Sequence, residues 1–321
     1  MSKPPKVSII VAAYKAEAFL PTAIETCLAQ SLSDLEVLIV DDASPISLEP
    51  TVKAAAGGDQ RVRFLRLETN QGPSAARNLG LHHARGEFIA VLDADDLMAS
   101  HRLQVLLTLA EQTGADIVAD NLIVFRNQID DLGAALYFQI AMTNSAIDIS
   151  LSDLMMSNFG QFGNSLGYLK PVFRRSFLDS HGSRYPTDLR NSEDYYFLAE
   201  LLAAGAQMKL CAEGLYYYRR HDASISHRIS PEAADRVANA EARFRTNFGD
   251  TLAPRECVLS QRKERDALEM ARFERMIAEL KKRNPIGATS LLLSRPQALP
   301  RHVMKLVSIG FQKVVSRSGG V

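Results

Sequence analysis

The sequence is poor in cysteine and has no long apolar run. Its 321 residues include only three cysteines, which lie far apart and form no CxxC pair. This argues against a disulfide framework and against a cysteine-ligated zinc site. No stretch approaches the roughly 20 apolar residues that a membrane-spanning helix requires, and the start, MSKPPKVSII, lacks the apolar segment and cleavage site of a secretory signal. We therefore expect a cytoplasmic chain without a transmembrane segment.

Net charge is also lacking, although both signs are abundant. Residues 281–321 hold eight of the 37 basic residues and none of the 37 acidic ones, so 37 minus 8 leaves 29 basic against 37 acidic residues before them. The net charge of zero is therefore the sum of about −8 in residues 1–280 and about +8 in the tail, residues 281–321. We expect no nucleic-acid partner.

Strand-like and helix-like segments alternate through the first 125 residues. This alternation predicts an α/β fold, in which a mostly parallel sheet is flanked by helices. β-branched runs and apolar alternation mark the strands, and apolar residues at helical spacing mark the helices. The predicted strands are 6–13, 35–44, 61–67, 87–96 and 115–125, and the predicted helices are 16–30, 72–86 and 101–114.

Acidic residues directly follow two of these strands. Asp41 and Asp42 end the second strand, and the stretch DADD places Asp93, Asp95 and Asp96 at the end of the fourth. Ligands of open α/β sheets bind at the carboxyl ends of the strands. Single aspartates there could simply cap the following helices. Acids gathered at two strand ends are better explained by a cation, because close carboxylates repel and resist burial unless something positive compensates them.

Four stretches resemble the motifs of family 2 glycosyltransferases, in the same order and with similar spacing. They are VSIIVAAYKAEAFL, VLIVDDAS, NQGPSAARNLGLHHARGEFIAVLDADD and NSEDYYFLAELLAAG, and the resemblance covers roughly residues 5–225. It implies a GT-A fold and an enzyme that transfers a sugar from a nucleotide sugar with inversion, usually with Mg²⁺ or Mn²⁺. Length and tail are similar to non-processive enzymes that build bacterial exopolysaccharide of the succinoglycan type. The QxxRW element of processive members is absent, which implies addition of a single sugar.

The resemblance also implies a metal site. DADD resembles the DxD motif of the family, so Asp95 and Asp96 are the expected ligands, with Asp93 nearer the ribose; which of the three touches the metal stays open. A divalent cation that bridges the donor phosphates would act as a Lewis acid. His221 belongs to a stretch similar to the family's YRxHxxSxS element and is expected to reach the metal or diphosphate, unless it is an exposed loop histidine.

Further donor contacts are carried over by the resemblance. Residues after the first strand would meet the base, although AAYK stands where PxYN is commoner. Asp42, or else Asp41, would accept the uracil N3–H, which favours UDP. Arg77 would meet the base or the diphosphate, unless it is an exposed helix arginine. The expected donor-binding residues are Ala12, Ala13, Tyr14, Glu17, Asp41, Asp42, Asn70, Gly72, Arg77, Asp93, Ala94 and Asp95.

An inverting transfer needs a general base for the acceptor hydroxyl. The resemblance to the family's ED motif makes Asp194 the expected base and Glu193 a positioning residue. Acids in the first turn of a helix also interact favourably with the helix dipole, so a purely structural role is the alternative. Loss of catalysis altogether would leave a nucleotide-sugar-binding module, which is the second functional hypothesis.

The remaining segments give the expected domain organisation. Residues 1–228 form the catalytic domain, with a donor half (1–125) and an acceptor half (126–228), and residues 229–321 form a helical extension with a basic tail. The acceptor is expected to be a saccharide, carried on a polyprenyl diphosphate, and Phe162, Tyr168 and Lys170 could contact it or pack against the sheet. A long charged helix in the extension could be solvated, brace the domain or form a homodimer. The tail, 301–315, could lie on an anionic membrane or dock on the domain.

Overall fold

The structure is a computed structural model that describes residues 3–126, 135–138, 146–161, 164–220 and 230–293. The chain divides into two compact units. The first is Met1–Ile225 together with Thr246–Leu259, and the second is Ser226–Arg245 together with Ser260–Val321. Each unit is taken by itself below.

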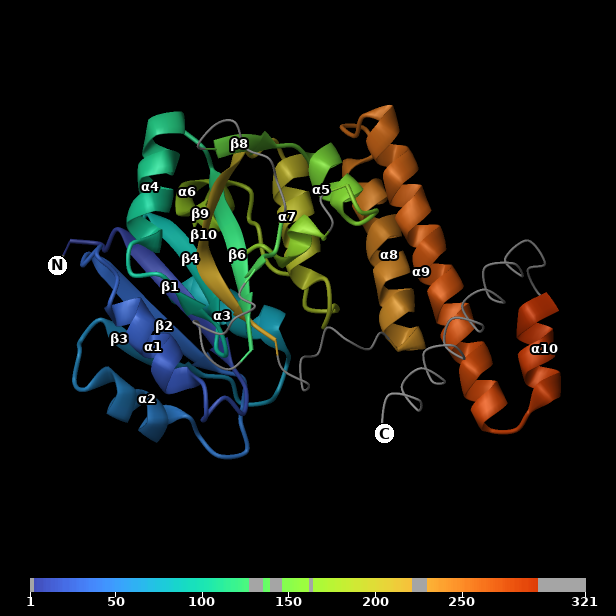
Figure 1. Cartoon of the computed structure of the whole chain (residues 1–321), viewed down its shortest axis with the longest axis horizontal. Coiled ribbons are helices and arrows are strands. Elements are labelled where there is room, and N and C mark those ends of the chain that lie inside the picture. Colours follow the sequence, from blue (N-terminus) through green and yellow to red (C-terminus); the bar gives the residue numbers. More distant parts are fainter. Residues whose placement is uncertain (1–2, 127–134, 139–145, 162–163, 221–229, 294–321) are drawn as a thin grey trace. The chain divides into compact units, whose positions relative to one another are not determined.

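One mixed sheet of ten described strands forms the centre of the first unit (Figure 1). The strands are β1 (Val7–Ala13), β2 (Leu35–Asp41), β3 (Val62–Arg66), β4 (Phe88–Asp93), β5 (Leu97–Met98), β6 (Ile117–Phe125), β7 (Ala135–Leu136), β8 (Ala146–Ile149), β9 (Val172–Arg174) and β10 (Met208–Arg219). Their order is β3-β2-β1-β4-β9-β6-β10-β5, with β7 beside β6 and β8 beside β10. Strands β1 to β4 run parallel to their partners in that group, and so do β6 and β10, whereas β9 pairs antiparallel with both β4 and β6.

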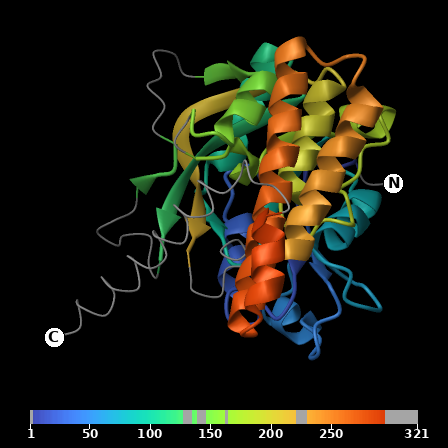
Figure 2. The ribbon, with the colours of Figure 1, turned by 90° about the vertical axis from the view of Figure 1, so that its right-hand side faces the viewer.

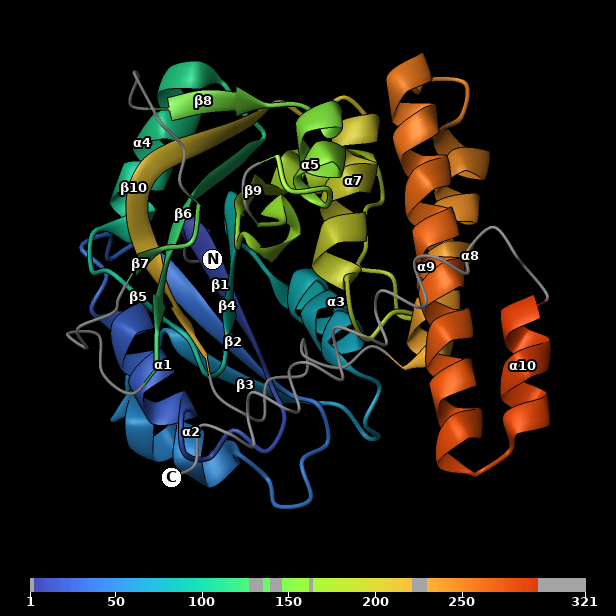
Figure 3. The same ribbon diagram turned by 45° about the vertical axis from the view of Figure 1, so that its right-hand side comes forward.

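Helices cover both faces of this sheet. Figure 3 shows α1 (Leu20–Leu28) and α4 (Arg102–Thr113) on one side, and α3 (Pro73–His83) and α7 (Glu193–Ala203) on the other. Because both faces are covered, the central strands are largely apolar and are buried along their length instead of alternating; all seven residues of β2 are buried. The other helices are α2 (Glu49–Ala56), α5 (Leu151–Ser157), the 3₁₀ helix η1 (Leu166–Tyr168) and α6 (Arg175–Ser180).

The predicted α/β fold is confirmed, with the predicted strands at β1, β2, β3, β4 and β6 and the predicted helices at α1, α3 and α4. Helix α2 and the strands β5, β7, β8 and β9 have no counterpart in the sequence analysis. These strands have two to four residues, which is too short for a periodic pattern to be seen.

Helix α3 packs closely on β1 because one position lacks a side chain. A Cβ atom at Gly80 would lie 2.5 Å from Cγ2 of Ile10. The close approach fixes α3 against the middle of the sheet. The N-terminal half of α3, which carries Arg77, is thereby held near the ends of the strands.

The second unit is helical, as expected of the extension. Helix α8 (Pro231–Phe248) and helix α9 (Pro254–Lys281) run side by side (Figure 2). Between them the buried carboxylate of Glu241 accepts a 2.6 Å hydrogen bond from Ser260 and pairs with Lys263 at 3.2 Å. Helix α10 (Pro285–Leu293) packs on α9 through Ala288, which joins Phe273 and Met276 in a small core. Within the described ranges, no helix is both long and apolar enough to cross a membrane.

Candidate active site

The acidic ends of β2 and β4 lie at the same edge of the sheet, on either side of β1. In the strand register Asp41 lies opposite Ala13, and Asp93 lies opposite Ala12. Ala12 is half-buried and Ala13 is buried. The parallel pairing therefore brings the two acidic strand ends to one rim, as the sequence predicts.

Asp41 organises the turn that follows β2. Its fully buried carboxylate accepts hydrogen bonds from the backbone N–H groups of Ser44 (2.9 Å) and Leu48 (3.3 Å). It also pairs with Arg66 of β3 at 2.5 Å. These contacts compensate its charge within the protein. Asp41 is therefore an anchor of the loop after β2.

Asp42 holds the loop that leads into α3. Its carboxylate accepts hydrogen bonds from the backbone N–H groups of Gln71 and Gly72, both at 2.8 Å, and from the side chain of Asn70 at 2.9 Å. Gly72 has φ +93°, a backbone conformation that favours glycine. The predicted residues Asn70 and Gly72 are thus brought to the predicted Asp42.

The loop after β1 presents an aromatic face at the same edge. Tyr14 is 44% exposed, Glu17 is exposed, and the ammonium of Lys15 lies 5.2 Å from the centre of the Tyr14 ring. The backbone of Lys15 has φ +52° and donates a 2.9 Å hydrogen bond to Ser44. This bond ties the loop after β1 to the loop after β2.

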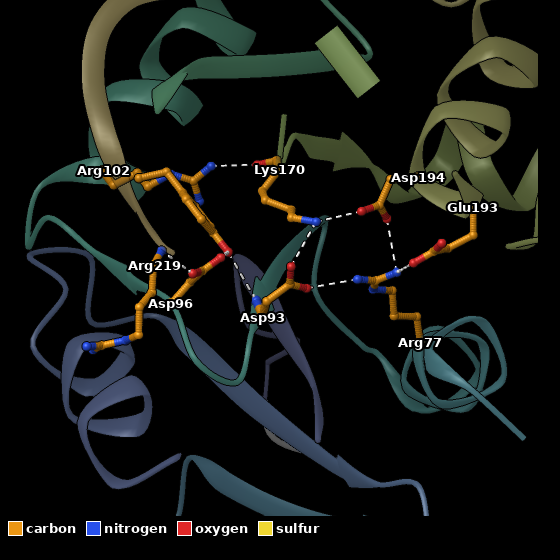
Figure 4. A network of polar contacts seen from close by, with 9 residues as sticks. Arg77, Asp93, Asp96, Arg102, Lys170, Glu193, Asp194 and Arg219 are labelled. Carbon is orange, nitrogen blue, oxygen red and sulfur yellow. Dashed lines mark hydrogen bonds and ion pairs between the residues drawn. The ribbon is translucent and has the colours of Figure 1, made fainter. Parts of the chain in front are cut away.

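A ring of four charged side chains joins β4 to α7 (Figure 4). Arg77 lies 2.8 Å from Oδ1 of Asp93 and 3.0 Å from Oδ1 of Asp194. Lys170 lies 2.9 Å from Oδ2 of Asp93 and 2.5 Å from Oδ2 of Asp194. Each of the four carboxylate oxygens therefore contacts a cation, and each of the two cations contacts one oxygen of each aspartate. Arg77 also donates to Glu193 at 3.0 Å, so it is not an exposed helix arginine.

Burial and charge oppose each other in this ring. Burial disfavours the charge on Asp93, but the cations Lys170 and Arg77 outweigh it and hold the pKa of this carboxyl below its ordinary value. Burial also disfavours the charge on Lys170, yet Asp194 and Asp93 raise its pKa well above the usual range. Burial raises the pKa of Glu193, and the adjacent Asp194 adds to the rise. The cations stay charged and keep the carboxylates in place.

The first turn of α7 is entered through a strained residue. Ser192, directly before Glu193 and Asp194, has φ +69°, which is uncommon for a residue with a side chain. Such strain persists only where the surrounding structure enforces it. Helix α7 favours negative charge in its first turn, and its two acids also meet cations from other elements, so the helix dipole alone does not explain them.

Asp96 and Asp95 differ in their surroundings. Asp96 is 1% exposed and accepts 2.7 Å hydrogen bonds from the Tyr216 hydroxyl and the Arg219 backbone, one on each oxygen. Burial, together with the charges of Asp95 and Asp93, raises its pKa well above the ordinary value. Asp95 is half-buried, and its backbone carbonyl accepts a 2.8 Å hydrogen bond from Arg219.

The residues at the end of β4 fit a divalent cation of the Mg²⁺ or Mn²⁺ type. Within the described residues, no group of three or more His, Cys, Asp or Glu side chains is placed to hold a metal ion. A full protein cage is not needed, because Mg²⁺ is usually held by one or two carboxylates and by substrate phosphates. The half-buried Asp95 carboxylate, beside the buried Ala94, offers the oxygen that such an ion prefers. The predicted ligand His221 lies outside the described residues, as does Phe162.

Some contacts of the site could not be predicted from the sequence. Lys170, which the sequence gave as a candidate for acceptor contact or for packing against the sheet, contacts two carboxylates. Tyr216 and Arg219 lie on β10, about 120 residues after Asp96. Arg219 belongs to the stretch that resembles the YRxHxxSxS element, but the resemblance did not indicate its contact with Asp96. Tyr168, 36% exposed, forms a group of rings with Tyr137 and Tyr218, at centroid distances of 5.7 and 6.3 Å.

Comparisons with known proteins agree with this fold. Residues 8–160 match the model of Glycosyl transferase family 2. The chain is 33% identical over 319 residues to the succinoglycan biosynthesis protein ExoO of Rhizobium meliloti, covering 99% of this chain and 89% of that one. The chain therefore belongs to glycosyltransferase family 2. This finding confirms the family resemblance.

A more distant relative and two solved structures add to this. A GalNAc(5)-diNAcBac-PP-undecaprenol β-1,3-glucosyltransferase of Campylobacter jejuni is 29% identical over 177 residues, 55% of this chain and 54% of that one. S. aureus TarS 1–349 in complex with UDP-GlcNAc has a TM-score of 0.61 at 17% identity, over 91% and 92% of the two chains. The mannosyltransferase PcManGT from Pyrobaculum calidifontis, in complex with GDP-Man and Mn²⁺, has a TM-score of 0.59 at 18% identity, over 97% of this chain and 81% of that one. At these identities the two structures show the fold, which is GT-A.

Proposed function

We propose that this chain is an inverting, non-processive glycosyltransferase that moves a hexose from a UDP-sugar to a saccharide acceptor. The acceptor is carried on a lipid diphosphate, and the product is an intermediate of exopolysaccharide or another surface glycan. Near full-length similarity to a succinoglycan biosynthesis protein, a relative named for an undecaprenol-linked acceptor, and a fold neighbour with UDP-GlcNAc support this proposal. The observation that carries it is the charged ring that joins Asp93, at the donor end of β4, to Asp194 on α7.

The donor lies over the carboxyl ends of β1, β2 and β4. Tyr14 offers its exposed ring to the base. Asp42 accepts the uracil N3–H, since its Oδ1 accepts one hydrogen bond from Gln71 and a carboxylate oxygen has room for two. Asp93 and Arg77 meet the ribose and the diphosphate, and Glu17 lies beside the base pocket.

Asp95 is the proposed ligand of a divalent cation. When bound, the cation would stabilise, as a Lewis acid, the negative charge that develops on the departing phosphate. Asp96 positions the loop instead, because it is only 1% exposed and its two oxygens hold the Tyr216 hydroxyl and the Arg219 backbone. His221 stays a predicted contributor.

Asp194 is the proposed general base. Each of its oxygens contacts one cation and keeps a lone pair with which it can accept the proton of an acceptor hydroxyl. That hydroxyl oxygen attacks the anomeric carbon as UDP leaves from the opposite face, which inverts the configuration. Glu193 holds Arg77 in place through its 3.0 Å contact.

The proposed function is tested by measuring UDP release. The purified chain is supplied with Mn²⁺, with UDP-glucose, UDP-galactose or their N-acetyl analogues, and with bacterial lipid extract as acceptor. We expect release with one donor, dependent on the extract, and a product whose anomeric configuration is opposite to that of the donor. Asp194→Asn should lose at least about 100-fold in rate, while calorimetry still detects UDP-sugar binding.

Two results would contradict the proposal. Binding of UDP-sugars without turnover by the wild-type chain would favour the nucleotide-sugar-binding module. Unchanged turnover in Asp194→Asn would move the general base to another residue. Membrane contact of the tail, a homodimer and a cytoplasmic location stay predictions, and the tail lies outside the described residues.

A further inference from the structure

The side chain of Lys170 is buried between two carboxylates that come from distant parts of the chain. Its ammonium is 2.9 Å from Asp93 and 2.5 Å from Asp194, and the side chain is 7% exposed. Lys170 itself lies between η1 and β9, so it belongs to neither of the elements that it joins. Figure 4 shows it pointing between the two acids, opposite Arg77.

The two cations of the ring constrain the carboxylates in different ways. Arg77 is a planar fork that contacts Oδ1 of each aspartate and also Glu193. Lys170 contacts Oδ2 of each aspartate. A carboxylate held at one oxygen can still rotate about that contact. When both oxygens are held, the plane of the carboxylate is fixed, and so is the direction of its remaining lone pairs.

The backbone of Lys170 is held independently of its ammonium. Its carbonyl accepts a 2.5 Å hydrogen bond from Arg102, which is itself paired with Asp120 at 2.7 Å. Removal of the ammonium therefore leaves the main chain anchored. Burying an ammonium is unfavourable unless its partners compensate it. The partners of Lys170 are Asp93 and Asp194, so its charge serves these two carboxylates of the site.

We propose that Lys170 is a positioning residue for the transfer reaction: its ammonium fixes the orientation of the Asp194 carboxylate relative to the donor end of β4. This inference rests on the proposed role of Asp194 as general base. The charged and titratable groups that face Asp194 are Lys170, Arg77 from α3, Glu193 beside it, Asp93 from β4 and Tyr185. Lys170 contacts Oδ2 of Asp194, whereas Arg77 contacts Oδ1. Arg77 therefore cannot replace the contact that is lost when the ammonium of Lys170 is removed.

The experiment compares Lys170→Met with Lys170→Arg in the full chain. The readouts are kcat and KM for sugar transfer, measured separately. In Lys170→Met we expect kcat to fall about 100-fold through misplacement of the base, while KM for the UDP-sugar changes by less than about tenfold. Lys170→Arg keeps a cation between the two aspartates and should recover at least about a tenth of the wild-type kcat.

Lys209→Met is the matched control. Lys209 pairs with Asp148 at 2.6 Å. It lies at the start of β10, whereas Tyr216 and Arg219 lie at the end of that strand. Loss of this pair should leave kcat and KM unchanged. A role of Lys170 in packing alone would lower the melting temperature without a selective loss of kcat.

The outcomes separate this inference from the proposed function. A wild-type chain that transfers no sugar defeats the proposed function. A wild-type chain that transfers sugar, together with a folded Lys170→Met variant that keeps the wild-type kcat, overturns the role of Lys170 only. If Lys170→Met and Lys170→Gln both fail to fold while Lys170→Arg keeps full kcat, Lys170 supports the fold and the inference is likewise overturned.

Discussion

Arg102→Met removes the positive partner of a fully buried carboxylate. Arg102 and Asp120 are each 1% exposed and are paired at 2.7 Å. Removal of one partner from a buried ion pair costs about 3–5 kcal/mol of stability, because the other charge is left uncompensated. The guanidinium also lies 5.0 Å from the Tyr216 ring and donates to the carbonyl of Lys170. We therefore expect a loss of about 4 kcal/mol in the free energy of unfolding at pH 7.

The size of this loss should depend on pH. Burial raises the pKa of Asp120, and Arg102 acts against that rise. A carboxyl whose pKa is raised on folding binds more protons in the folded chain than in the unfolded chain, so it makes stability increase as the pH falls. Without Arg102 the rise is larger. The loss caused by Arg102→Met should therefore be smaller at pH 5 than at pH 7.

Urea denaturation followed by far-ultraviolet circular dichroism measures both effects; the chain has no tryptophan to follow by fluorescence. Lys209→Met removes a pair whose side chains are 26% and 81% exposed, so it should cost at most about 1 kcal/mol. Replacement of both partners, Arg102→Met with Asp120→Leu, should restore part of the stability. A loss below about 1 kcal/mol for Arg102→Met at pH 7, or an equal loss at both pH values, would refute the reasoning.

Two further predictions concern the acidic rim. Asp95→Ala should abolish sugar transfer with an unchanged melting temperature. Asp96→Asn should keep more activity but lower the melting temperature, because Asp96 holds Tyr216 and Arg219. UDP release and thermal melts of both variants check this, and higher activity in Asp95→Ala than in Asp96→Asn would contradict it. Asp42→Ala removes three hydrogen bonds from the loop before α3. It should weaken UDP binding at least about tenfold, which calorimetry measures; an unchanged affinity for UDP would contradict this prediction.

The parallel part of the fold was predictable because its signals are local. The strands β1, β2 and β4 read as apolar runs because helices cover both of their faces, and the alternation with helices implied parallel pairing. Parallel pairing then placed the acids that follow β2 and β4 at one rim. The short antiparallel strands could not be predicted, since β9 has only three residues and its pairing with β4 and β6 depends on tertiary contacts.

The candidate site was predictable as a set of acids, but not as a set of ion pairs. The motif likeness singled out Asp93, Asp95 and Asp194, yet nothing in it gave the partners of these carboxylates. The structure gives several of them: Asp93 and Asp194 share Lys170 and Arg77, and Asp96 holds Tyr216 and Arg219.

The sequence by itself determined the class of fold, the family and the side of the sheet on which charge gathers. These follow from periodicity and from residues adjacent in the chain. Only the tertiary structure decided that Lys170 and Arg77 close a ring around Asp93 and Asp194, across separations from 16 residues (Arg77 to Asp93) to 194 minus 77, or 117, residues (Arg77 to Asp194). A buried charge is stable only beside its partner, and which partner it meets depends on how the strands and helices pack.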